Sequence, residues 1–146
     1  MGLDLFTAME VSASGLTAER VRMNALASNL ANARTTRTAQ GGPYKRLDPV
    51  FQAVPLAMHQ GAAVGTRHTG AYLVEVPTIR QDEGAPQMMY DPQHPDADER
   101  GFVALPNVNV VEEMTNMISA SRSYQANVEV LNTAKTLMVK TLTIGQ

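Results

Sequence analysis

Apolar side chains recur at helical spacing through the first 33 residues. Polar and charged residues such as Glu10, Glu19 and Arg22 lie largely off this stripe, and no proline interrupts it. The pattern predicts one long amphipathic helix, in which Gly15 costs about 1 kcal/mol relative to alanine. The residues expected to form the apolar seam of this helix are Leu5, Met9, Leu16, Met23 and Leu30.

A second helical pattern runs from residue 108 to 146. Asn109 is placed to cap its N-terminus, with Glu112 as a capping-box partner and Glu113 close to the positive end of the helix dipole. The pattern predicts another long helix with a seam built from two series of residues seven apart, of which the second is weakened by Ser121 and Lys135. The first series is Val110, Met117, Tyr124, Leu131 and Met138, and the second is Met114, Ser121, Val128, Lys135 and Leu142.

The middle of the chain, residues 34–107, has a different composition. It holds all eight prolines and seven of the ten glycines. Short extended segments are predicted at residues 45–54, 72–79, 87–90 and 101–105, and a turn at Gly41-Gly42-Pro43. This composition indicates a small, irregular β-rich segment.

These regions together predict an α+β fold. The terminal helices, 1–33 and 108–146, form a discontinuous coiled-coil-like domain, and 34–107 form the central segment. Each helix has only a narrow seam, so we expect an isolated copy to be marginally stable and to bury more surface against neighbouring copies. Spacing alone favours the alternative of an ordinary intramolecular helix hairpin, and the breaks at Arg20 and Lys135 agree with it.

Charge and composition exclude several functional classes. The net charge of −2 argues against a nucleic-acid partner, and the absence of cysteine excludes disulfides, thiolate metal sites and cysteine nucleophiles. No stretch is apolar enough to insert in a membrane, and the first residues do not resemble a cleaved signal peptide.

The segment from Asp91 to Gly101 is the one candidate for chemistry. It begins like a calcium-binding loop at Asp96-x-Asp98, but Asn107 stands where the bidentate glutamate belongs. We therefore expect a polar contact loop in preference to a metal site. His59 and His68 have no acid nearby in sequence and are expected to be solvated. We predict no cofactor and no enzymatic activity, since no nucleophile elbow, phosphate loop or zinc-protease motif occurs.

Several motifs, in order along the chain, resemble those of the flagellar axial rod proteins. The first motif lies at the end of the first predicted helix, and the last lies where the central segment meets the second predicted helix. The motifs Gly41-Gly42-Pro43-Tyr44 and Tyr90-Asp91-Pro92 lie between these two. Ala33-Arg34 departs from the Val-Asn of the family's usual run, which removes any turn hydrogen bond expected at residue 34. The residues that carry the two helix-flanking motifs are Ser28, Asn29, Ala31, Asn32, Thr35 and Thr36, and Pro106, Asn107, Asn109 and Glu112.

The resemblance implies a structural subunit of the periplasmic rod of the bacterial flagellum. Such a subunit would assemble through its terminal helices into a hollow shaft that transmits torque and conducts exported proteins. It would leave the cell through the flagellar type III export apparatus without a cleaved signal, and its partners would be further copies and the rod proteins FlgB, FlgF, FlgG and FliE. A soluble helix-hairpin adaptor is the alternative. The expected interface residues are the first-helix seam above, together with Val110, Met114, Met117, Tyr124, Val128, Leu131, Met138 and Leu142.

Overall fold

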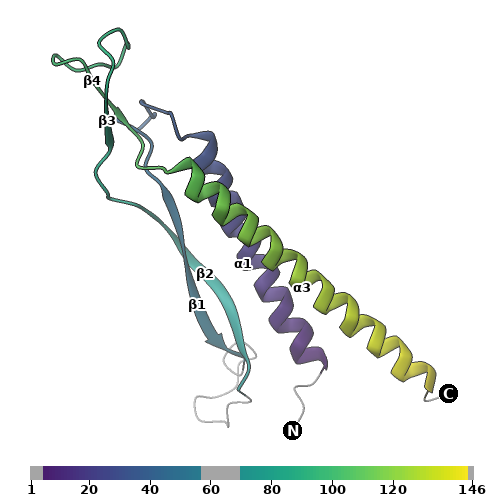
Figure 1. Cartoon of the computed structure of the whole chain (residues 1–146). Coiled ribbons are helices and arrows are strands. Elements are labelled where there is room, and N and C mark those ends of the chain that lie inside the picture. Colours follow the sequence, from purple (N-terminus) through teal and green to yellow (C-terminus); the bar gives the residue numbers. More distant parts are fainter. Residues whose placement is uncertain (1–4, 57–69, 145–146) are drawn as a thin grey trace. The chain divides into compact units, whose positions relative to one another are not determined.

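The structure is a computed structural model that describes residues 5–56 and 70–144. In chain order, one long helix is followed by four strands and a second long helix. The elements are α1 (Leu5–Ala31), β1 (Leu47–Pro55), β2 (Tyr72–Gln81), β3 (Gln87–Tyr90), β4 (Phe102–Leu105) and α3 (Val110–Ile144) (Figure 1). The α+β prediction is confirmed. The predicted strands are found with ends shifted by no more than a few residues, and neither described helix is long and apolar enough to cross a membrane.

The chain forms two compact units, and each contains parts of both helices. The first unit comprises Met1–Val21, Val50–Pro77 and Ser119–Gln146, and the second comprises Arg22–Pro49 and Thr78–Ile118. Each unit therefore combines helical residues with residues of the middle segment. The predicted division at residues 33 and 108 follows the sequence pattern, and it remains a prediction.

The first unit holds a small apolar cluster beside α1. Leu56, Ala71 and Leu73 are buried together, with Val11 of α1 packed against them. Ser14 of α1 accepts a hydrogen bond of 3.1 Å from the backbone nitrogen of Val74, so this hydroxyl ties β2 to the helix. The β1–β2 sheet thereby gains a hydrophobic backing that a two-stranded sheet needs for stability.

α1 and α3 approach each other closely in the first unit. A Cβ added at Gly15 would lie only 2.8 Å from Nδ2 of Asn127, and Ala120 and Ala134 of α3 are buried. Small side chains at such a crossing let two helix backbones come near. Gly15, whose cost to the helix was anticipated, is explained by this contact.

The second unit contains the β3–β4 hairpin and the junction of both helices with β1. β3 and β4 are antiparallel, with Met88 opposite Ala104 and Tyr90 opposite Phe102. The Tyr90 and Phe102 rings meet edge to face with centroids 5.3 Å apart. The predicted turn at Gly41 and Gly42 is present, and both glycines adopt positive φ angles of 87° and 73° that favour glycine.

Candidate functional site

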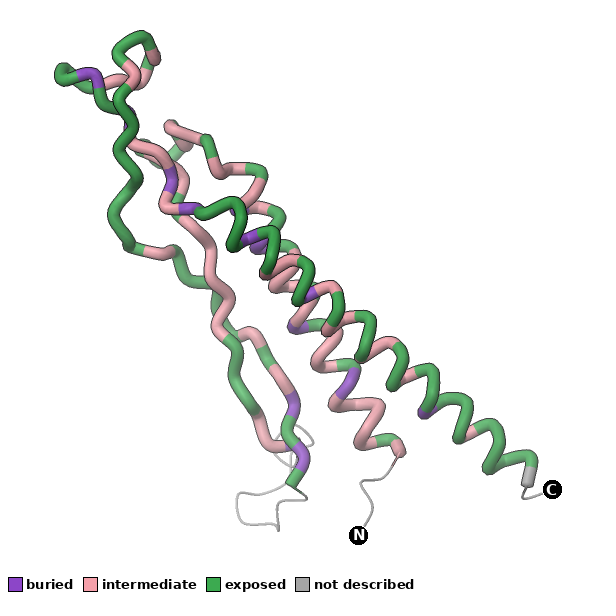
Figure 2. Tube along the Cα trace, viewed as in Figure 1, coloured by how far each residue is buried: buried purple, intermediate pink, exposed green. Residues whose placement is uncertain are grey.

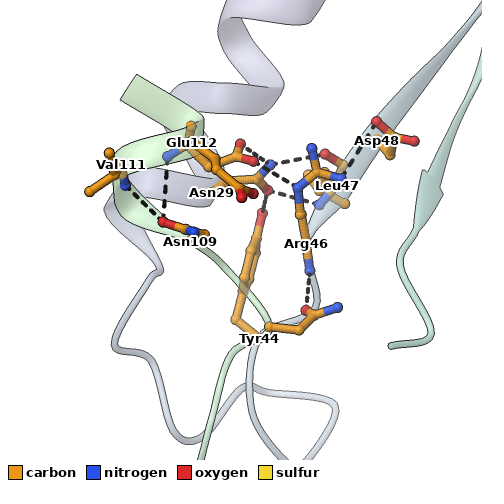
Figure 3. Close-up of polar contacts among 10 residues, drawn as sticks. Asn29, Tyr44, Arg46, Leu47, Asp48, Asn109, Val111 and Glu112 are labelled. Atoms are coloured by element: carbon orange, nitrogen blue, oxygen red, sulfur yellow. Dashed lines mark hydrogen bonds and ion pairs between the residues drawn. The ribbon is translucent and has the colours of Figure 1, made fainter. Parts of the chain in front are cut away.

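The side chain of Asn29 occupies the centre of a buried polar cluster in the second unit (Figure 3). Its Nδ2 donates to the backbone oxygen of Leu47 at 2.9 Å and to Oε2 of Glu113 at 2.8 Å. Its Oδ1 accepts from the backbone nitrogen of Leu47 at 2.8 Å and from the hydroxyl of Tyr44 at 2.9 Å. An amide has two donors and two acceptor positions, so Asn29 is fully satisfied although it is 0% exposed. By bonding both backbone groups of Leu47, it pairs with β1 as a neighbouring strand would.

Glu113 brings a negative charge into this cluster from the first turn of α3. It is 1% exposed, and its Oε1 accepts a hydrogen bond of 2.7 Å from Nε of Arg46. A buried carboxylate is tolerated only when it is paired and hydrogen-bonded, and Glu113 meets both conditions through Arg46 and Asn29. The guanidinium also lies 3.7 Å from Asp48.

The electrostatics of the cluster favour charged Arg46. The hydrogen bond to Glu113 raises the pKa of the guanidinium, partial burial opposes this effect, and the negative charges of Glu113, Asp48 and Asp82 add to the rise. Arg46 also connects further segments through its backbone. Its nitrogen donates to Oδ1 of Asn107 at 3.2 Å, and its oxygen accepts from the nitrogen of Asp82 at 2.8 Å.

The motif that closes α1 makes the turn that presents Tyr44. Asn32 donates from Nδ2 to the backbone oxygen of Ser28 at 2.9 Å, and its Oδ1 accepts from the Thr35 hydroxyl at 3.2 Å. The backbone nitrogen of Tyr44 donates to the oxygen of Thr35, and the Tyr44 hydroxyl lies 3.2 Å from that of Ser28. Thr36 donates to Asp96 at 2.8 Å. Ala31 is exposed, and nothing in the structure explains its place in the motif.

The second motif starts α3 in the predicted way, with one difference. Oδ1 of Asn109 accepts from the backbone nitrogens of Val111 at 3.1 Å and Glu112 at 3.4 Å, which confirms it as the N-cap (Figure 3). Pro106 is buried just before it. The Glu112 side chain is exposed and, within the described chain, returns no hydrogen bond to Asn109, so the capping-box half of the expectation is wrong. The adjacent Glu113 points inward instead.

The acidic residues of the Asp91–Gly101 segment shape turns. Asp98 accepts hydrogen bonds from the backbone nitrogens of Arg100 and Phe102, and Asp91 accepts one from Gln93. Asp96 is engaged by Thr36 and lies 3.9 Å from Arg37. Within residues 5–56 and 70–144, no three histidine or acidic side chains converge as metal ligands would. His59 and His68 lie outside the described residues.

The predicted interface residues fall into two groups in the structure. Those of α1 are half-buried, as are Met117, Tyr124, Val128, Leu131 and Met138 of α3. Val110, Met114 and Leu142 are exposed, Met114 by 53% and Leu142 by 72%. Their role between subunits remains a prediction, because the structure contains a single copy.

Within the chain, α3 uses a different companion row from the one predicted. Glu113, Ala120 and Ala134 are buried and stand at heptad positions, with half-buried Asn127 completing the series. This row lies one residue before the predicted Met114 series. At the close approach, Gly15 faces Asn127, so this row and not the predicted one is the row of α3 that meets α1 there.

Several apolar side chains of α3 consequently face away from both α1 and the strands. Most of the helix surface is exposed along its length (Figure 2). In the second unit these side chains are Val110, Val111, Met114 and Ile118, and in the first unit they are Val130, Leu137, Val139 and Leu142. Exposed apolar side chains that share one side of a helix, as Val110, Val111, Met114 and Ile118 do, mark an interaction surface.

The sequence pattern did not identify Arg46, Tyr44 and Glu113 as parts of one site. Tyr44 and Glu113 occur inside motifs that were noted, but without a contact assigned to them. The signal that points to them is Asn29 itself, since a polar residue on the apolar side of a helix needs partners when it is buried. Which partners it meets depends on tertiary structure.

Two family models match the chain, and their ranges include Asn29 and Glu113 of this site. Residues 9–37 match "Flagella basal body rod protein", and residues 99–144 match "Flagellar basal body rod FlgEFG protein C-terminal". The first covers most of α1 and the turn after it, and the second covers β4 and α3. Both matches are to flagellar basal-body rod proteins, and this is the class to which the helix pair belongs.

Relatives that match over nearly the full length identify the family within this class. The chain is 46% identical to the flagellar basal-body rod protein FlgC of Escherichia coli O6:H1, over 97% of this chain and 98% of the relative. It is 38% identical to the FlgC of Borreliella burgdorferi over 99% of both chains, and 39% identical to that of Bacillus subtilis over 97% and 98%. The chain belongs to the FlgC family of flagellar basal-body rod proteins, and it is a structural subunit of the rod.

Proposed function

We propose that this chain forms part of the proximal, periplasmic section of the rod and assembles there through its terminal helices. The assembled shaft transmits torque and leaves a channel for proteins exported later. Further copies and the rod proteins FlgB, FlgF, FlgG and FliE are its neighbours. The chain reaches the rod through the flagellar type III export apparatus.

The exposed apolar side chains of α3 carry this proposal. Val111, Met114 and Ile118 stand at positions i, i+3 and i+7, so they lie on one side of the helix and are exposed together. A single copy has no element to cover them among the described residues. Helices from neighbouring subunits would bury this surface, and many weak contacts of this kind resist torque better than one joint.

The polar cluster supports the proposal by setting the register of the helix pair. Asn29 and Glu113 must align for their hydrogen bond to form, so sliding α1 along α3 by one turn would break it and leave a charge buried without a partner. Fixed register gives every subunit the same outward surface. A repeating shaft needs such identical surfaces, because an error at one contact recurs at each repeat.

We infer that the chain has no catalytic activity of its own. The polar side chains that converge in the second unit are engaged with one another or with the backbone, and Asn29 has no bonding capacity left for a substrate. Family membership favours the rod subunit over the helix-hairpin adaptor. The adaptor would form a stable, soluble monomer or dimer, and cells would build rods without it.

Deletion of the gene tests this function. We expect non-motile cells whose membrane rings carry no rod or hook in electron micrographs, and rescue by the intact gene. A chain truncated before Leu131 should be expressed but should not enter rods, because it lacks the exposed end of α3. Normal rods and swimming in the deletion strain would contradict the proposal, and incorporation of the truncated chain would contradict the role given to α3.

A further inference from the structure

The end of α3 has apolar side chains on two sides and almost no cover. From residue 135 to 143 every residue except Met138 is exposed, and Leu137, Val139 and Leu142 are exposed by half or more. Val139 and Leu142 stand three residues apart and lie on one side of the helix, whereas Leu137 lies on the other side, about 160° from Val139 and about 140° from Leu142. Apolar side chains on two sides of a helix are buried only when more than one other element packs against it.

The first unit also contains a groove that no element of the described chain fills. It has a volume of about 500 Å³ and lies between α1 and β2. Apart from Glu10, its α1 wall is made of small or short side chains, and apart from Glu75, its β2 wall is apolar. The lining residues that matter here are Ala13, Thr17 and Val21 of α1, and Leu73, Val76 and Pro77 of β2.

We propose that the end of α3 from one copy docks into the α1–β2 groove of a second copy. The inference rests on the proposed function, and it names the two surfaces that meet. The short side chains of the α1 wall leave space that Leu137, Val139 or Leu142 would occupy. The groove of the second copy and α1 of another neighbouring copy would together cover the exposed apolar side chains at the end of α3.

Charge supports a second copy of this chain as the occupant. Residues 135–144 contain Lys135 and Lys140 and no acidic residue. The ionisable residues that line the groove are both acidic, Glu10 and Glu75. Each of these carboxylates also has a polar contact within its own chain. They therefore make the groove negatively charged, and the proposal does not require either of them to form an ion pair with a lysine. Opposite signs guide the two surfaces together and disfavour alternatives of like charge.

The two surfaces are different, and this determines the kind of assembly. The groove is lined by α1 and β2, and no α3 residue takes part in it. A contact between unlike surfaces is heterologous and leaves one groove and one α3 end open on each pair of copies. Such contacts propagate into an open helical array instead of closing as a dimer.

Cross-linking in assembled rods tests the contact. The sequence has no cysteine, so introduced thiols react without background. Two copies with different tags would be expressed together in the deletion strain, one carrying Thr17→Cys in the groove and the other Thr141→Cys on α3. Both side chains are exposed, and the presence of both tags in isolated rods is checked before the thiols are cross-linked. After treatment with a short bis-maleimide, we expect a product that carries both tags.

A matched pair places the second thiol elsewhere. Gln93→Cys is equally exposed but lies in the second unit, in the turn after β3, and it should give no such product with Thr17→Cys. In parallel, Leu142→Asp should reduce rod incorporation at least tenfold, whereas Thr143→Asp, also exposed, should change it less than twofold. The aspartate pair does not depend on thiol geometry, so it tests the α3 end separately.

The outcomes separate this inference from the function on which it rests. Rods that contain both cysteine variants but give no doubly tagged product would overturn the docking and leave the rod function intact. A cross-link from Thr141→Cys to a different protein would overturn the choice of a second copy as partner. A deletion strain that still builds rods would overturn the proposed function itself.

Discussion

The side-chain nitrogen of Asn29 lies 2.8 Å from Oε2 of Glu113, and this hydrogen bond joins residues 84 positions apart in the sequence. It connects the last turns of α1 to the first turn of α3. Arg46 holds the other oxygen of the same carboxylate at 2.7 Å. One buried charge therefore fixes both helices and β1 at a single point.

Replacing Asn29 with alanine should strongly destabilise the chain. The change removes the partner of Oε2 of Glu113 and of both backbone groups of Leu47, and it removes the acceptor of the Tyr44 hydroxyl, which costs about 3 kcal/mol of the free energy of unfolding. Asn24→Ala is the control, since Asn24 is an exposed asparagine on the same helix. Urea unfolding of both variants measures the difference. Equal effects of the two substitutions would show that the cluster contributes nothing specific.

Glu113→Gln should destabilise the chain much more than the same change at Glu112, its neighbour in sequence. Loss of the buried charge removes the closest carboxylate from Arg46 and leaves it only the more distant Asp48, and we expect a cost of about 3 kcal/mol. Glu112→Gln changes an exposed residue at the same helix end, and only its interaction with the helix dipole is lost, less than about 1 kcal/mol. Thermal and urea unfolding compare the two variants. A larger loss for Glu112 would contradict the assigned burial.

Arg46→Lys should make stability sensitive to alkaline pH. The hydrogen bond to Glu113 raises the pKa of Arg46, so its contribution is complete below the unfolded-state pKa and is lost only as pH rises through the still higher folded-state pKa. For arginine this loss lies above pH ~12, but lysine has an ordinary pKa of about 10.4, so the variant loses the contribution within reach of experiment.

The comparison uses unfolding free energies at a series of pH values from neutral to alkaline. Arg37→Lys is the control, because the Arg37 side chain is 80% exposed and lies as far as 3.9 Å from Asp96. We expect the Arg46 variant to diverge from the unmodified chain as pH rises, and the Arg37 variant to follow it. If the unfolding free energies of the unmodified chain and both variants changed with pH in parallel, this would argue against a stabilising Arg46–Glu113 pair.

The elements of the fold could be predicted because their signals are local. Heptad spacing marks both helices, and proline, glycine and β-branched residues mark the strands and turns between them. The N-cap at Asn109 could likewise be predicted, since it depends on residues two and three positions away. These features require no knowledge of what packs against them.

The buried polar cluster, and the row of α3 residues that is buried within the chain, could not be predicted in the same way. Glu112 and Glu113 are the same residue type at the same helix end, and only the position of Asn29 and Arg46 decides which of them is buried. In the seam, weighting by hydrophobicity selects Met114, whereas the close helix crossing selects Ala120. Both differences arise from tertiary contacts between distant segments.

Ser14→Ala should loosen β2 locally. The Ser14 hydroxyl is the hydrogen-bond acceptor for the backbone nitrogen of Val74, and its removal should cost about 1 kcal/mol at this position. Hydrogen exchange at the Val74 amide should accelerate several-fold. Ser12→Ala is the control, because the Ser12 hydroxyl donates to the Ala8 carbonyl of its own helix. If Val74 exchanges equally fast in both variants, β2 is not held by Ser14.

Gly15 and Asn127 should be energetically coupled. Gly15→Ala alone gains about 1 kcal/mol of helix propensity but places a Cβ 2.8 Å from Nδ2 of Asn127, so the side chain or the helix must shift. We expect a net loss of about 1 kcal/mol, since overpacking typically costs 1–3 kcal/mol.

Adding Asn127→Ala removes the obstructing amide and should let the alanine at position 15 contribute its full helix propensity. The double variant should then be more stable than Asn127→Ala alone, although Gly15→Ala destabilises the unmodified chain. A double-mutant cycle by urea unfolding measures this reversal of sign, with an expected coupling of about 1–2 kcal/mol. Additive effects would mean that α1 and α3 do not approach each other at Gly15, and that another contact selects the alanines of the α3 seam.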